Sequence, residues 1–246
     1  MFTTSAIVIK EVDYRDNDKM LALFSPKYGR IDALSRGCKK QGSKLMASSQ
    51  LFNCGEYTFN SKKDKNYHSG CVIKHSFYNL RDNYEKLFTA SFFVEMISAF
   101  IMPNQEDKKI YALLLNSLFS LENNLNKPHD IIQFFLVKLS DLVGLRPYIE
   151  KCMSCDESKI SFYFSFDEGG ILCLNCARKT LGKKRRITEK TINIMESIFS
   201  LPSKSICEKY DVSFSKSLVD IMFVYLQDKS HLKIKSYNLL KQIVTS

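Results

Sequence analysis

The first third of the chain alternates apolar and polar positions over short stretches, a period that predicts β-strands. Turn residues interrupt this pattern at Ser25–Gly29 and in the lysine-rich segment Ser61–Asn66, so we expect a hairpin at each point. The predicted strands are Ala6–Ile9, Met20–Phe24, Arg30–Leu34, Gly55–Phe59 and Tyr67–His75. Five short strands joined in this way are typical of a small barrel. We expect the polar, basic segment Gly37–Gln50 to form a long, mobile connection.

From about Asp82 onward, apolar residues recur every three or four positions, which predicts amphipathic helices. The expected helices run from about Asp82 to the residue before Pro103, then over Glu106–Glu122, Pro128–Val143, Thr188–Phe199 and Phe214–Gln227, with a last amphipathic stretch over 232–244. Gly144 and Pro147 stop the third helix, and Thr188 can cap the fourth. We interpret the apolar stripes as core. The fold class is therefore α+β, with a barrel domain over residues 1–79 and a helical domain over 80–246.

Two pairs of cysteines interrupt the helical domain. The first reads Cys152-Met-Ser-Cys155, and the second, after seventeen intervening residues, reads Cys173-Leu-Asn-Cys176. Two Cys-x-x-Cys pairs at this separation match a four-thiolate zinc site. Such a closed site has no open coordination position, so one bound zinc ion would be structural rather than catalytic. Two disulfides, or four unrelated buried thiols, are the alternatives.

The residues between the cysteine pairs can fold back on themselves and bring the pairs together. Ile160–Phe166 has the composition of a strand, Asp167–Gly170 that of a turn, and Ile171–Leu172 begins a return strand. The prediction is a zinc-ribbon-like hairpin, at about residues 150–178, inserted in the helical domain. We interpret the other four cysteines as ordinary small apolar residues, namely Cys38, Cys54, Cys71 and Cys207.

The charge balance points to a polyanionic partner. The chain has 36 Lys and Arg against 26 Asp and Glu, a formal net charge of +10. Such a charge favours nucleic acid or an anionic membrane surface, although a lysine-rich proteome would produce the same balance. We find no signal peptide and no window of ~18 apolar residues that could span a bilayer, so we expect a cytoplasmic protein. In that compartment Cys-x-x-Cys pairs favour metal over disulfides.

Residues that could form an active site are sparse. The chain has no phosphate-binding loop motif, and its four histidines stand apart. Asp13, Asp16 and Asp18 could be imagined as a magnesium site, but Arg15 and Lys19 interrupt them, so a solvated loop is the better interpretation. We therefore expect no enzymatic activity.

Basic residues cluster in the predicted barrel. Residues 1–75 contain 13 Lys or Arg against 7 Asp or Glu. Basic side chains hold phosphates and aromatic side chains stack on unpaired bases, which is how an OB-fold barrel binds single strands. The candidate DNA-binding residues in this region are Arg15, Lys19, Phe24, Lys27, Tyr28, Arg30, Arg36, Lys39, Lys40 and Lys44. Lys183, Lys184, Arg185 and Arg186 form a second candidate track, and a solvated basic surface is the alternative for both groups.

The ordered motifs resemble the RecO family of bacterial DNA repair proteins over nearly the whole chain. The resemblance is carried by Tyr14-Arg-Asp-Asn-Asp-Lys-Met-Leu-Ala-Leu-Phe24 followed by Tyr28-Gly-Arg-Ile31, by Ser35-Arg-Gly-Cys-Lys-Lys40, by Leu80-Arg81 and by Leu142-Val-Gly-Leu-Arg-Pro147. It continues through the two cysteine pairs, with Phe164-Ser165 and Glu168-Gly169-Gly170 between them, to Lys235-Ser236. No single piece is specific, but the ordered set is.

The resemblance implies an N-terminal OB-fold, a helical bundle and an inserted zinc module. It implies a protein that binds single- and double-stranded DNA at the nucleoid and anneals complementary strands without ATP. With RecR it would help load RecA onto strands coated by single-strand-binding protein. We expect that protein's acidic tail to dock on the C-terminal part of the chain, where Lys216, Lys229, Lys233 and Lys235 accompany Leu232, Ile234 and Leu239.

Two other hypotheses come from different classes. In the first, the chain is a zinc-containing adaptor that binds proteins and has no direct contact with nucleic acid. In the second, Asp13, Asp16 and Asp18 serve a metal-dependent nuclease. Strand annealing, absence of DNA binding, and cleavage are the observations that would separate the three.

Overall fold

A computed structural model describes residues 1–155, 162–230, 233–238 and 240. The chain divides into two compact units, residues 1–118 and 119–246. Each unit has its own secondary structure and core. Six residues of the predicted helical stretch over 232–244, and the first two residues of the predicted strand Ile160–Phe166, lie outside the described residues.

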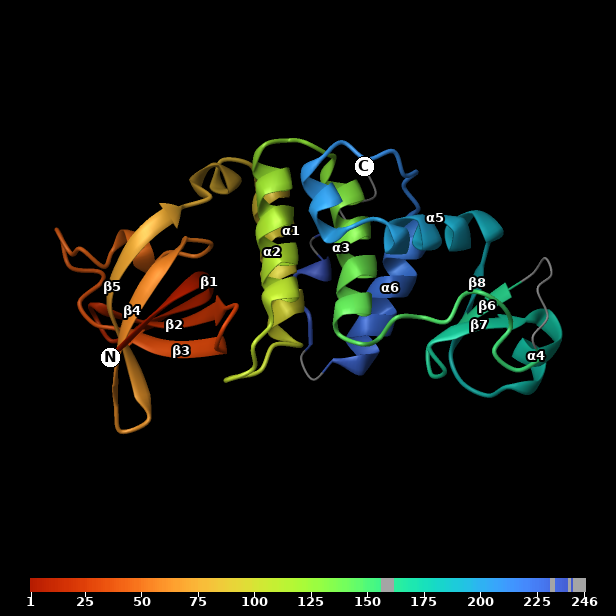
Figure 1. Cartoon of the computed structure of the whole chain (residues 1–246), viewed down its shortest axis with the longest axis horizontal. Helices are drawn as coiled ribbons and strands as arrows, with labels where there is room; N and C mark the ends of the chain where they lie inside the picture. The colour runs from red at the N-terminus through yellow and green to blue at the C-terminus, as the bar shows by residue number, and fades with distance from the viewer. Residues whose placement is uncertain (156–161, 231–232, 239, 241–246) are drawn as a thin grey trace. The chain divides into compact units, whose positions relative to one another are not determined.

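The N-terminal unit begins with a closed five-stranded barrel. Its strands are β1 (Phe2–Tyr14), β2 (Asp18–Ser25), β3 (Gly29–Ser35), β4 (Cys54–Lys62) and β5 (Lys65–His75). They close in the order β1-β2-β3-β5-β4, and β3 pairs with β5 in parallel whereas the other neighbours are antiparallel (Figure 1). This is the OB-fold barrel that the sequence predicts, and all five expected strands are present.

The barrel is held together by the inward-facing half of each alternating strand. One apolar cluster contains the fully buried side chains of Val8, Leu23, Tyr57 and Phe59. Removing such side chains from water is the main favourable contribution to folding, at roughly 25 cal/mol for each Å² of apolar surface buried. Residues in the intervening positions face outward; some of them, such as Ile7 and Phe24, are buried on the outside of the barrel, and others are exposed.

The connection between β3 and β4 is packed at the barrel towards its end, whereas much of the segment Gly37–Gln50 is exposed and forms turns, so its mobility stays a prediction. A short 3-10 helix, η1 (Ala47–Ser49), lies in it, and Ser48 and Ser49 are buried. The Tyr57 hydroxyl donates a hydrogen bond to the Ser48 carbonyl at 2.8 Å. The hydroxyl groups of Ser48 and Ser49 make buried hydrogen bonds, whereas the lysines of the segment are exposed.

After the short η2 (Tyr78–Arg81), the N-terminal unit continues with two helices. These are α1 (Tyr84–Ser98), which contacts β1, and α2 (Lys108–Glu122), which crosses the unit boundary. The segment between them lies against the β2–β3 turn, where the Arg30 amide donates to the Met102 carbonyl at 3.1 Å. Gly29 allows this close approach, because its φ is +62° and a Cβ there would lie 2.1 Å from that carbonyl oxygen.

In the C-terminal unit, α3 (Pro128–Leu142) is surrounded by other elements. The run from Ile131 to Ser140 is buried without interruption, and the helix contacts α5 (Glu189–Ser200), η3 (Ser203–Cys207) and α6 (Lys216–Lys229). The buried Lys138 ammonium donates a hydrogen bond to the Phe199 carbonyl at 2.9 Å and so provides a partner for a carbonyl in the last turn of α5. Thr188 caps α5 as predicted, accepting a bond from the Thr191 amide. Among the described residues, no helix is long and apolar enough to cross a membrane.

A small antiparallel sheet follows α3. Its strands are β6 (Phe162–Ser165), β7 (Gly170–Cys173) and β8 (Lys184–Ile187), in the order β7-β6-β8, with the short α4 (Leu174–Lys179) after β7 (Figure 1). The predicted hairpin is confirmed, but no local sequence pattern indicated α4 or β8. Charged residues fill most of β8, so its strand character is decided by pairing with β6 rather than by apolar alternation.

Candidate metal centre and nucleic-acid interface

The small sheet brings the two cysteine pairs together. The first pair precedes the sheet, and its Met153 amide donates to the Ile171 carbonyl of β7 at 3.0 Å. The second pair begins at the end of β7, and the Cys173 sulfur caps α4 by accepting from the Cys176 amide at 3.5 Å. One strand therefore positions both pairs.

The four sulfur atoms converge on one point. All four Sγ atoms lie within 4.8 Å of one another, and those of Cys155 and Cys173 are 3.6 Å apart. Four sulfurs each ~2.3 Å from a zinc ion lie about 3.8 Å apart in a regular tetrahedron. A disulfide requires about 2.05 Å, and all four cysteines are free thiols. The donor set and its geometry therefore fit a closed four-thiolate metal site and exclude the disulfide alternative in this structure.

The protein environment shifts the pKa values of two of the four thiols, and it favours the thiolate form of Cys152. Burial by itself would raise the pKa of the Cys152 thiol, but hydrogen bonds from the backbone at Cys173, Ser154 and Cys155 overcome it and lower that pKa to about 6. The pKa of Cys176 is raised to about 12, chiefly by its hydrogen bond with Cys155. Thiolate is the ligand form of cysteine, so a cation that balances the converging negative charge would complete the cluster.

Within the part of the chain that the structure describes, these cysteines are the one group of His, Cys, Asp or Glu side chains that converges in this way. Asp13, which the nuclease hypothesis needs, instead pairs with Lys39 at 2.8 Å. Hydrogen bonding to Lys39 lowers the pKa of the Asp13 carboxyl. Asp18 accepts a bond from the Gly37 amide at 2.8 Å. These carboxylates hold loops together and do not assemble a magnesium site.

The basic candidates of the barrel lie on its outside and at its ends. Exposed or half-exposed positions are occupied by Arg15, Lys19, Lys27, Tyr28, Arg30, Arg36, Lys39, Lys40 and Lys44. Several are already engaged: Lys19 pairs with Glu11 at 2.5 Å, and Arg30 pairs with Asp32 at 3.0 Å. Such exposed pairs contribute little to stability and can exchange for a phosphate at little cost.

Phe24 cannot stack on a base, so its selection as a candidate is corrected. Its side chain is 0% exposed, with its ring 5.5 Å from that of Tyr111. Phe24 alternates with Leu23, which lies in the barrel core, so Phe24 faces outward and is buried beneath Tyr111 of α2, whereas the basic residues that suggested a binding role lie in the following turn and loop. Although Phe24 is close to these basic residues in the sequence, it does not share their exposed surface.

The second basic track lies at and beside β8, and three of its four members already have partners. Lys183 pairs with Asp228 at 3.5 Å, and Arg185 pairs with Asp220 at 3.2 Å, so both connect the small sheet to α6. Lys184 donates to the Thr180 carbonyl. Arg186 is exposed. This arrangement fits attachment of the module better than a continuous phosphate track.

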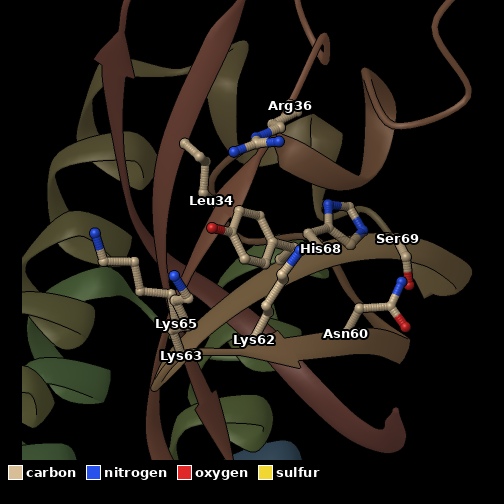
Figure 2. Close-up of a pocket in the computed structure, with 9 residues that line it drawn as sticks. Leu34, Arg36, Asn60, Lys62, Lys63, Lys65, His68 and Ser69 are labelled. Carbon is tan, nitrogen blue, oxygen red and sulfur yellow. The ribbon is translucent and has the colours of Figure 1, made fainter.

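The structure adds a site that the sequence did not indicate. A hollow of about 600 Å³ on the barrel is lined by Arg36, by Tyr67 and by three lysines of the β4–β5 hairpin, namely Lys62, Lys63 and Lys65 (Figure 2). The lysine run was visible in the sequence as a hairpin signal. Its position beside Arg36 depends on the parallel pairing of β3 with β5, which no local pattern reveals.

These features define a class: an OB-fold barrel with a basic surface, joined to a helical region that carries a four-cysteine module. The comparisons with known proteins agree with it. Residues 1–77 match the family model described as Recombination protein O N terminal, and residues 81–236 match Recombination protein O C terminal. The chain belongs to the RecO family of DNA repair proteins.

Individual relatives extend over most of the chain. The chain is 33% identical to DNA repair protein RecO of Acetivibrio thermocellus over 180 residues, which cover 73% of this chain and 72% of the relative. It is 27% identical to DNA repair protein RecO of Halalkalibacterium halodurans over 241 residues, 96% of this chain and 93% of the relative. The family consists of non-enzymatic recombination mediators, in agreement with the expectation that the chain is not an enzyme.

Proposed function

We propose that the chain binds DNA through residues 1–79 and anneals complementary single strands. The observation that carries this proposal is the basic outer surface of an OB-fold barrel in a chain of the RecO family. Annealing requires that two polyanions approach each other and that their bases remain free to pair. Lysine and arginine side chains that neutralise phosphates supply the first condition, and an open barrel surface supplies the second.

We also propose that the four-cysteine cluster holds one zinc ion. Cys152, Cys155, Cys173 and Cys176 would hold it, and the ion would supply cross-linking between the chain before the sheet and β7. A site closed by four sulfurs leaves no position for a substrate, so the proposed role is structural. The cysteines are the ligands that zinc prefers when the site is purely structural.

The proposed partners follow from family membership. They are single- and double-stranded DNA, RecR, the acidic tail of single-strand-binding protein and, indirectly, RecA, which the chain would help to load at the nucleoid in the cytoplasm. Of the expected docking surface for the tail, one apolar residue is core and one lysine already has a hydrogen-bond partner. Ile234 is 5% exposed and forms core, Lys229 donates to the Asp167 carbonyl, and Leu232 and Leu239 lie outside the described residues.

An annealing assay tests the DNA proposal. The purified full chain is mixed with two complementary labelled oligonucleotides, with and without magnesium, and duplex formation is followed by energy transfer between the labels. We expect duplex formation to be accelerated in both conditions, because charge neutralisation by side chains needs no metal. Absence of any DNA binding would support the protein-only adaptor, and cleavage in magnesium would support a nuclease; either result contradicts the proposal.

A further inference from the structure

A row of apolar side chains crosses the outer surface of the barrel. The strand register pairs Val12 with Met20, Met20 with Leu34, and Leu34 with Tyr67, so the four are neighbours on β1, β2, β3 and β5. Ala33, next to Leu34, points inward and is buried, so the row faces outward. Val12 is 49% and Met20 is 37% exposed. We call these four residues the outer row; contiguous exposed apolar side chains of this kind mark an interaction site.

Two hollows meet at one end of the outer row. The hollow of about 600 Å³ lies towards the β4–β5 hairpin, and a second of about 520 Å³ lies towards Tyr14 and Met20. Leu34, Arg36, Lys65 and Tyr67 line both hollows. Each has the size of a ligand pocket, ~300–1,000 Å³. Tyr67 therefore stands between two spaces that are each large enough to receive a planar group.

Flat cationic and aromatic groups border these spaces. The Arg36 guanidinium lies over the Tyr67 ring, 4.7 Å from its centroid, and the Arg15 guanidinium lies 5.3 Å from the centroid of Tyr14. Unpaired nucleobases stack on aromatic rings and on guanidinium planes, and this stacking tolerates any base because every base has a π-face. The second hollow thus has a tyrosine and an arginine at each end.

Positive charge surrounds the first hollow. Figure 2 shows the Arg36 guanidinium on one side and the lysines of the β4–β5 hairpin on the other. Lys62, Lys63 and Lys65 are exposed, and none is in an ion pair with any residue that the structure describes. Asp64 is the single acidic residue between Ser61 and Asn66. Unpaired ammonium groups beside aromatic planes fit a phosphate-linked chain of bases better than an apolar protein surface, which would leave these charges unmatched.

We propose that the outer row and the Arg36–Tyr67 pair form a stacking slot for the unpaired bases of a single strand, whose phosphates contact Lys62, Lys63 and Lys65. This inference rests on the proposed DNA binding and adds how the strand is recognised. Bases in a duplex already stack on one another and cannot enter the slot. The slot therefore gives the barrel a preference for single strands, and Tyr67 is the residue that determines it.

The test separates base stacking from phosphate contact. Binding of the full chain is measured by fluorescence anisotropy with three labelled probes: an oligothymidylate, an abasic oligomer of the same length, and a duplex. The wild type should bind the oligothymidylate more tightly than the abasic oligomer. Tyr67→Leu, which keeps apolar bulk but removes the ring, should weaken oligothymidylate binding about tenfold and leave the other two affinities unchanged. Tyr67→Phe keeps the ring and should bind like the wild type.

Tyr78→Leu is the matched control. Tyr78 is 59% exposed and has the Arg81 guanidinium 5.8 Å from its ring centroid, but it lies outside the barrel, in η2. Its replacement should change none of the three affinities. Melting temperatures of all variants show whether each remains folded. If Tyr67→Leu does not fold, the comparison between oligothymidylate and abasic oligomer in the wild type and in Tyr67→Phe still decides the question.

The outcomes distinguish the two proposals. A wild type that binds none of the probes contradicts the proposed function itself. A wild type that binds oligothymidylate and abasic oligomer equally shows DNA binding without a stacking slot, and so overturns this inference alone. If Tyr67→Leu leaves all three affinities unchanged, as Tyr78→Leu should, the outer row is a protein-binding surface instead.

Discussion

His68 is a buried polar residue in the barrel core. Its Nδ1 lies 3.0 Å from the Ser35 hydroxyl, its Nε2 lies 3.4 Å from the Ser48 hydroxyl, and its ring is 5.3 Å from that of Tyr57. These contacts connect β5, β3 and the packed loop before β4. The neutral imidazole therefore holds β5 against β3 and the loop by hydrogen bonds, directly beside Tyr67, its neighbour on the strand.

The neutral form of His68 makes the barrel sensitive to acid. Burial lowers the pKa of His68 to about 4, against a partly opposing hydrogen bond with the Gly70 backbone. Unfolded histidine titrates near ~6.5, so between these values the unfolded chain binds more protons than the folded one. Stability from this group is complete above pH ~6.5 and falls as the pH drops towards 4, by up to about 3 kcal/mol.

Two measurements check this prediction. NMR titration of the His68 imidazole in the folded chain should give a midpoint well below ~6.5. Denaturant unfolding at pH 7 and pH 5 should show lower stability at pH 5, and His68→Gln should reduce that difference because the variant has no imidazole to protonate. An imidazole midpoint at the ordinary histidine value would show that the ring is solvated, contrary to its 4% exposure.

At the scale of elements, the small sheet depends on more than its hydrogen bonds. β6, β7 and β8 have four residues each, and a sheet with strands this short makes few ladder hydrogen bonds. The local apolar cluster around the cysteines contains few residues, among them Leu172, Ala177 and Tyr163. A bound zinc ion would contribute the missing stability, because a structural site forms only in the folded chain and its binding free energy adds to folding.

Cys155→Ser tests that role. The variant retains three thiolates, so we expect it to lose stoichiometric zinc while the barrel stays folded. Loss of even ~2 kcal/mol would lower the melting temperature of the C-terminal unit by roughly 4–8 °C. Elemental analysis and thermal unfolding measure the two effects. Cys207→Ser, which lies outside the cluster in η3, is the control and should keep its zinc.

Either of two results would contradict the zinc proposal. One is a wild type that contains no stoichiometric metal after purification without chelators. The other is a Cys155→Ser variant that retains as much zinc as Cys207→Ser. Retention by the three remaining thiolates would show that Cys155 is not needed to hold the ion.

For the whole molecule, the position of positive charge matters more than its amount. The formal net charge is +10, yet several basic side chains are committed to ion pairs, and those of β8 connect the module to α6. The barrel region 1–75 has an excess of six positive charges. Released counterions make DNA affinity depend on salt, and only side chains that touch phosphates contribute to that dependence.

Replacing Arg36, Lys39 and Lys40 by alanine should therefore reduce the salt dependence of single-strand binding. Each lost phosphate contact lowers the logarithmic slope by about 0.7. The control is a triple replacement of Lys190, Lys204 and Lys209, exposed lysines of the C-terminal unit that carry the same total charge. It should leave the slope unchanged. Equal slopes for both triples and the wild type would show that the loop after β3 does not touch the strand.

Much of this protein could be predicted from the sequence, because the relevant information is local. Alternation along each strand fixes which side chains can be buried together, and the helical period does the same in α1, α2, α3, α5 and α6. The two Cys-x-x-Cys pairs predict a metal site because each pair lies within one turn of the chain, whatever surrounds it. The order of motifs was enough to indicate the family.

Tertiary structure decided which residues from distant parts of the sequence share a surface. Met20, Leu34 and Tyr67 are far apart in sequence, and the pairing of three strands makes them neighbours. Phe24 lies beside basic residues in the sequence but is fully buried, because Tyr111 of α2 packs against its ring. β8 is a strand because β6 accepts it as a partner. Register and strand order depend on long-range packing of the whole core, so a stacking slot built across four strands is determined only when the barrel closes.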